Sequence, residues 1–127
     1  MTIWLSKQIV LAIHDEQLAE HGGAIGVRND GLLESALARP LNLASYGEPD
    51  IAELAAMYAL GVVRNHPFID GNKRTGYVML ETILLLNGAT FPVSDGEAVI
   101  TILRLAAGDL TDDAFADWVR SHTRLPP

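Results

Sequence analysis

The clearest hydrophobic pattern in the chain lies between residues 50 and 65. Apolar residues fall there at i, i+3, i+4, i+7 and i+11, which is the spacing of one helix face. The stripe consists of Ile51, Leu54, Ala55, Tyr58 and Val62. Asp50 and Glu53 form a capping box at its start, and Pro67 disfavours a helical conformation at His66. The pattern therefore predicts a helix that follows Asp50 and ends at a turn before Pro67.

A first helix is expected near the N-terminus. Ser6 can cap it, and Gly22-Gly23 can end it after about residue 20. We expect Ile9, Val10 and Ile13 to face inward.

A short second helix is expected to start at Asn29 or Asp30. Because proline removes a backbone donor and clashes with the preceding turn, Pro40 is expected to stop this helix. Residues 41–49 contain Asn, Ser, Gly and Pro and indicate a loop. The apolar positions of the helix are Leu32, Leu33, Ala36 and Leu37.

Three further helices follow the turn at Pro67. One runs from about Asn72 to Asn87, and its apolar residues occupy more than one face, so we expect it at the centre. These residues are Val78, Leu80, Ile83, Leu84, Leu85 and Leu86. Ser94 opens the next helix, and Thr111 caps the last one, in which Phe115, Trp118 and Val119 are expected inward. The chain therefore predicts an all-α fold, a compact bundle of about six helices in a single domain over residues 1–127.

Composition narrows the classes of function. The chain of 127 residues is 49% hydrophobic and has no cysteine, which favours a globular protein of a reducing cytoplasm. No signal-peptide pattern and no apolar run of roughly 20 residues is visible, so we expect no membrane partner. The net charge of −7 argues against nucleic acid. Arg64, Lys73 and Arg74 nevertheless cluster around one segment, which suits a small phosphorylated ligand.

That segment, His66 to Thr75, carries the candidate chemistry. A phosphate at the start of the following helix would meet free backbone N–H groups and two cations. Asp70 could hold a hard cation such as Mg²⁺ against it, and His66 could take a proton from an attacking hydroxyl. Phe68 is expected to be a core anchor, and Thr75 a capping or phosphate-contacting hydroxyl. The expected phosphate-binding residues are Gly71, Asn72, Lys73 and Arg74.

The pair His14-Asp15 suggests a different chemistry, because such pairs occur in metal phosphohydrolases. That chemistry needs further His and Asp ligands, and the other histidines are only His21, His66 and His122. We therefore expect His14 to be a surface or boundary residue.

The segment resembles the core motif of the Fic/Doc family, His-Pro-Phe-x-(Asp/Glu)-Gly-Asn-x-Arg, and the ending Lys73-Arg74-Thr75 resembles its Doc branch. The resemblance implies a toxin of a toxin–antitoxin pair with a helical Fic/Doc-like fold. It implies that the toxin uses ATP and Mg²⁺ to phosphorylate a hydroxyl of a protein target, by resemblance a threonine of elongation factor Tu. His66 would be the general base, Asp70 the metal residue, and Gly71 to Arg74 the nucleotide-binding residues.

Three positions decide between the branches. Fic enzymes that transfer AMP usually carry glycine at the position of Lys73 and a second arginine at the position of Tyr77, whereas Doc toxins share the lysine and lack that arginine. Val78 stands where Doc-like chains can have a polar residue. AMP or nucleotidyl transfer remains one alternative, and a catalytically inactive Fic-fold module that only binds a partner is another.

No internal inhibitory motif is visible. Many Fic proteins inhibit themselves through a helix with Ser/Thr-x-x-x-Glu-Gly/Asn, but no glutamate of this chain precedes Gly or Asn. We therefore expect restraint to come from a separate small antitoxin that folds on binding.

Overall fold

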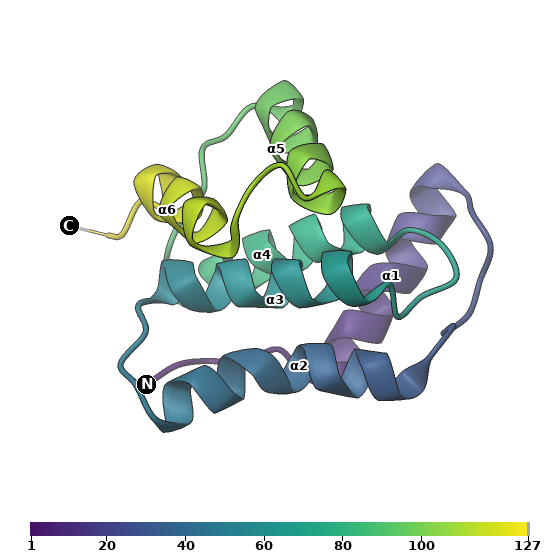
Figure 1. Ribbon diagram of the computed structural model, residues 1–127, viewed down its shortest axis with the longest axis horizontal. Helices are drawn as coiled ribbons and strands as arrows, with labels where there is room; N and C mark the ends of the chain where they lie inside the picture. Colours follow the sequence, from purple (N-terminus) through teal and green to yellow (C-terminus); the bar gives the residue numbers. More distant parts are fainter. Residues whose placement is uncertain (127) are drawn as a thin grey trace.

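The computed structural model describes residues 1–126, which form an all-α bundle. Figure 1 shows α3 and α4 side by side through the middle, α2 on one side, α5 and α6 on the other, and α1 crossing behind one end. The predicted all-α bundle of about six helices is confirmed. The six helices are α1 (Lys7–His21), α2 (Asp30–Ser45), α3 (Ile51–Asn65), α4 (Asn72–Leu86), α5 (Asp95–Ala107) and α6 (Asp112–His122).

Side-chain caps fix where five of these helices begin. In each case the oxygen of the capping side chain accepts a hydrogen bond from the backbone N–H three residues later. The caps are Ser6, Asn29, Asp50, Ser94 and Thr111. The predicted helix starts are therefore confirmed, because a cap depends on residues that are close in sequence.

The end of α2 differs from the prediction. The helix continues through Pro40 to Ser45, so the expected stop at Pro40 and the expected loop over residues 41–49 were wrong. Pro40 is buried, and the loop between α2 and α3 covers only residues 46–50. An interior proline costs about 3 kcal/mol, and we infer that packing of α2 against α3 offsets this cost.

The core forms around α3, which has ten buried residues. Gly76 lets α4 approach it closely, because a Cβ there would lie 3.1 Å from both the Ala59 carbonyl oxygen and Val63 Cγ2. However, α4 buries a single face. The helix lies at the centre as expected, with contacts to α1, α3 and α5, but Leu85 and Leu86 lie off its buried face and are 70% and 39% exposed.

Ile9 was also wrongly expected to face inward. It lies off the buried stripe of α1 and is exposed. The stripe consists of Val10, Ile13, His14, Gln17 and Leu18.

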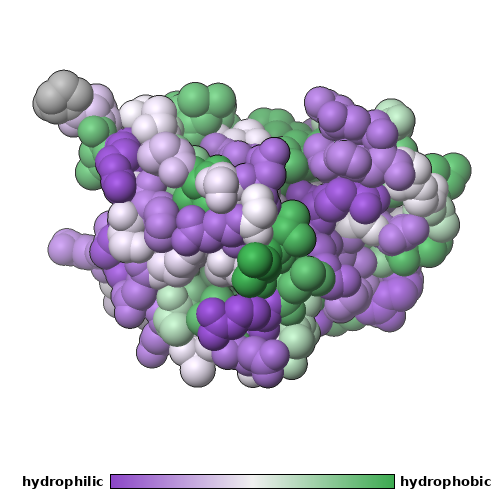
Figure 2. All heavy atoms as spheres, turned by 90° about the horizontal axis from the view of Figure 1, so that it is seen from above, coloured by the Kyte–Doolittle hydropathy of each residue, from purple (hydrophilic) through white to green (hydrophobic). Residues whose placement is uncertain are grey.

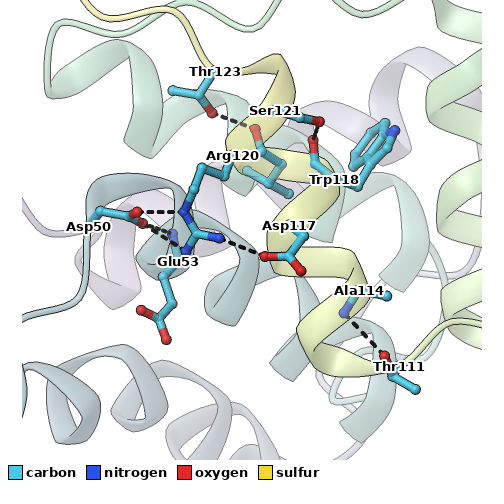
Figure 3. Close-up of polar contacts among 10 residues, drawn as sticks. Asp50, Glu53, Thr111, Ala114, Asp117, Trp118, Arg120, Ser121 and Thr123 are labelled. Carbon is cyan, nitrogen blue, oxygen red and sulfur yellow. Dashed lines mark hydrogen bonds and ion pairs between the residues drawn. The ribbon is translucent and has the colours of Figure 1, made fainter.

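An ion-pair cluster joins α6 to the start of α3 (Figure 3). Arg120 Nε lies 2.6 Å from Asp50 Oδ2, and Arg120 Nη1 lies 2.8 Å from Asp117 Oδ1. Asp50 also caps α3 through the Glu53 N–H at 2.8 Å. The cluster thus anchors the helix whose other end carries the candidate motif. Among residues 1–126, no helix is both long and apolar enough to cross a lipid bilayer.

Candidate active site

The motif forms a tight corner between α3 and α4. His66 ends α3 in the left-handed conformation, with φ 50° and ψ 54°, and its N–H donates to the Val62 carbonyl at 3.1 Å. Among the described residues it is the one non-glycine residue with positive φ. A left-handed residue is a common helix end, and for a non-glycine residue this conformation is uncommon and is enriched at functional sites. The predicted turn before Pro67 is therefore confirmed, and it leaves the His66 side chain exposed.

The segment between α1 and α2 braces this corner. Arg28 donates from its backbone N–H to the Pro67 carbonyl at 2.7 Å, and from its guanidinium Nε to the His66 carbonyl at 2.7 Å. The Ile69 N–H donates to the Gly26 carbonyl at 3.1 Å. Sequence reasoning missed Arg28, because no local pattern links it to residues almost forty positions later.

Phe68 and Asn72 hold the corner from inside. Phe68 is 1% exposed, which confirms its expected place in the core. The Asn72 side chain is buried and makes two bonds to Phe68, accepting from its N–H and donating to its carbonyl, both at 3.0 Å. Asn72 Nδ2 also lies 3.4 Å from His66 Nδ1. The Asn72 side chain therefore stiffens the loop and restrains the histidine.

The start of α4 presents unpaired donors. Gly71 caps the helix with φ 77°, which favours glycine, and it supplies no capping side chain. Within residues 1–126, the first-turn N–H groups of Asn72, Lys73 and Arg74 have no hydrogen-bond partner. Thr75 does not cap them, since its hydroxyl is buried and unbonded in the described part of the chain. Free N–H groups at a helix start, with two exposed cations beside them, are features that favour the binding of an anion.

Asp70 lies beside these donors as an exposed carboxylate. Its Oδ1 accepts the Gly71 N–H at 2.9 Å and its Oδ2 accepts the Ala24 N–H at 3.3 Å. These two bonds, the Gly71 bond first, hold the pKa of Asp70 below its usual value. Residues 1–126 contain no cluster of three or more His, Asp or Glu suited to a metal. A lone carboxylate is nevertheless compatible with Mg²⁺, which is usually held by one or two carboxylates and substrate phosphates.

A cavity of about 390 Å³ opens in front of the α4 N-terminus, between α1 and α5. Its lining is mixed. The residues from Asp70 to Arg74 lie there with the polar Gln17, His21 and Asp95, and the apolar lining comes from Val78 and the α5 residues Ala98, Val99, Ile102 and Leu103. Figure 2, which faces α5 and α6, shows apolar side chains gathered among polar ones. His66 is not among the residues that line the cavity. The cavity therefore places the start of α4 opposite a largely apolar face of α5.

Tyr77 lines the same cavity and is half-buried. Burial, and then the negative charges of Glu81, Asp95 and Glu97, raise the pKa of Tyr77 to about 12. The phenol is therefore neutral near physiological pH, and this position adds no cation to the cavity.

Two residues lie elsewhere than expected. His14 was predicted at the surface or boundary, but it is 2% exposed and packs under the motif. Arg64 was grouped with Lys73 and Arg74, but its guanidinium lies 3.0 Å from Asp112 Oδ1 at the start of α6. The described contacts of Arg64 therefore hold α6 and do not bring it to Lys73 and Arg74.

Comparisons with known proteins agree with the motif. The model of the Fic/DOC family matches residues 4–84. The chain is 30% identical over 117 residues to the protein kinase doc of Escherichia phage P1, covering 91% of this chain and 92% of that protein. It is 34% identical over 123 residues to the toxin Doc of Mycolicibacterium smegmatis, covering 91% of this chain and 90% of the relative. The chain therefore belongs to the Fic/DOC family.

Proposed function

We propose that this protein is a Doc-type toxin that transfers a phosphoryl group from ATP to a hydroxyl side chain of a protein target. One observation carries the proposal. Three unpaired N–H groups at the start of α4, with Lys73 and Arg74, face a cavity large enough for a nucleotide. The phage P1 relative is named as a protein kinase, which supports the same class of reaction.

Each residue of the motif has a role in this proposal. The N–H groups and the side chains of Lys73 and Arg74 bind and orient the phosphates, and Gly71 lets them approach the backbone. His66 accepts the proton of the attacking hydroxyl. Asp70 would hold Mg²⁺, which when bound neutralises phosphate charge. Such a reaction depends mainly on positioning and electrostatic stabilisation. His66 is exposed and does not line the cavity, so a hydroxyl on the surface of another protein can reach it and accept the phosphoryl group.

The neutral Tyr77 favours phosphoryl over nucleotidyl transfer. In the family, AMP transfer relies on an arginine at this position to orient the outer phosphates. Here a neutral phenol faces the cavity beside the carboxylates of Glu81 and Asp95. Outer phosphates held beside Tyr77 would meet negative charge instead of a cation. The γ-phosphate is therefore better placed at the N-terminus of α4, away from Tyr77.

A separate antitoxin is the proposed regulator. No inhibitory motif lies in the chain, and α5 leaves Val99, Ile100 and Leu103 between 51% and 61% exposed beside the cavity. An amphipathic segment that folds on binding could cover these residues in the helix-in-groove mode.

Labelled ATP tests the proposal directly. The purified protein is incubated with elongation factor Tu, the target that the resemblance implies, and ATP labelled at either the α- or the γ-phosphorus. We expect label from the γ-position alone and a phosphoryl mass increase on the target. Label from the α-position, or an adenylyl adduct, would show nucleotidyl transfer instead. Mass spectrometry of a whole-cell extract treated in the same way identifies another target if elongation factor Tu stays unmodified.

A further inference from the structure

His14 lies directly beneath the motif, although it belongs to α1. Its ring stacks flat on Phe68, with centroids 3.7 Å apart and planes 8° apart. Its Nε2 lies 2.9 Å from the carbonyl oxygen of Asp70. Because a carbonyl oxygen only accepts hydrogen bonds, this ring nitrogen is the donor. The buried imidazole thus makes two contacts, a stack and a hydrogen bond, with different residues of the motif.

The hydrogen bond acts on the peptide unit that connects Asp70 to Gly71. This unit is planar, so its carbonyl and its N–H point in opposite directions. A bond that holds the Asp70 carbonyl toward His14 therefore also fixes the direction of the Gly71 N–H. That N–H donates to Asp70 Oδ1 at 2.9 Å and so orients the carboxylate. His14 consequently acts on the carboxylate through the backbone.

The segment that follows α1 also holds Asp70, and it holds Arg74 as well. The Ala24 N–H donates to Asp70 Oδ2 at 3.3 Å, and Arg74 Nη2 donates to the Gly22 carbonyl at 3.2 Å. The Asp70 carboxylate and the Arg74 guanidinium are thus both tied to the α1 end of the molecule. Asp70 and Arg74 are themselves exposed, whereas His14, which bonds to the Asp70 carbonyl, is buried.

We propose that His14 is a positioning residue, which orients the Asp70–Gly71 peptide so that Asp70 and the start of α4 are set for a Mg²⁺-bound phosphate. This inference rests on the proposed function. The simpler reading is that His14 only fills the core beneath Phe68. If His14 is a positioning residue, its hydrogen-bond donor matters. If it only fills the core, its aromatic ring matters.

Two substitutions separate the donor from the ring. His14→Phe keeps an aromatic ring for the stack on Phe68 and removes the donor, whereas His14→Gln keeps a donor at about the position of Nε2 and removes the ring. Val10→Ala is the matched control, because Val10 is fully buried one turn earlier on the same face of α1. The substitution is expected to lower stability, and no hydrogen bond within residues 1–126 links Val10 to the motif.

The measurements are the melting temperature, the Mg²⁺ concentration that gives half-maximal ATP use, and the amide resonance of Gly71 in the ligand-free protein. We expect His14→Phe to need about tenfold more Mg²⁺, as loss of one hydrogen bond allows, and to shift the Gly71 resonance. His14→Gln should stay within about threefold of wild type, and Val10→Ala should change only the melting temperature.

The outcomes decide between the readings. Unchanged Mg²⁺ dependence and an unchanged Gly71 resonance in His14→Phe would show that His14 only packs. If His14→Phe does not fold, His14→Gln decides, because a wild-type Gly71 resonance in it supports positioning and a shifted one overturns it. A wild-type protein that does not use ATP would reject the proposed function, and the Gly71 resonance would still test the role of His14.

Discussion

Phe68 lies within the motif, yet we predict that its main role is to stabilise the fold. Its side chain is 1% exposed and stacks on the buried His14. Replacing a buried phenylalanine by alanine leaves a cavity and typically costs about 3–5 kcal/mol. For a domain of this size such a loss lowers the melting temperature by roughly 10–20 °C. We therefore expect Phe68→Ala to be strongly destabilised.

The next residue in the chain provides the control. Ile69 is 55% exposed, so Ile69→Ala should change the free energy of unfolding by no more than about 0.5 kcal/mol. Urea denaturation of both variants and the wild type, followed by circular dichroism, measures the difference. Equal stability of Phe68→Ala and wild type would refute the buried position of Phe68. An Ile69→Ala variant as unstable as Phe68→Ala would show that the whole loop, not one anchor, carries the stability.

Three further predictions concern the site and the α3–α6 contact. His66→Ala should abolish target phosphorylation and growth inhibition while its melting temperature stays near wild type, and full toxicity of the folded variant would exclude His66 as the base. Asp70→Ala and Arg74→Ala should each weaken the binding of Mg-ATP about tenfold or more, as loss of one charged hydrogen bond allows, which titration calorimetry can measure. Arg120→Ala should lose about 0.5–1 kcal/mol at neutral pH, since the pair is about half exposed. Because Arg120 lowers the pKa of Asp50 below 3.8, this contribution is present above pH 3.8 and is lost as the pH falls through the folded-state pKa. The stabilities of Arg120→Ala and wild type should therefore converge in acid, and a constant difference down to pH 2 would contradict the ion-pair explanation.

The sequence alone determined the features that depend on neighbours in the chain. Helix starts followed from caps such as Ser6 and Thr111, whose bonds span three residues. The turn at His66 followed from the steric restriction imposed by Pro67, and the anchor role of Phe68 from its large apolar side chain within the motif. The motif itself pointed to the family, because its unusual residue types are contiguous.

Only the tertiary structure decided the features that depend on distant segments. Pro40 is buried inside α2, which continues past it, and we infer that the packing of α2 against α3 outweighs the preference of proline to end a helix. Arg28 braces the motif from 38 residues away, and His14 bonds to Asp70 across 56 residues. A local pattern cannot reveal such contacts, because the burial and the partner of a polar side chain depend on how the helices pack. The sequence therefore identified the candidate motif, while the packing of α1 and the segment that follows it decided what holds that motif in place.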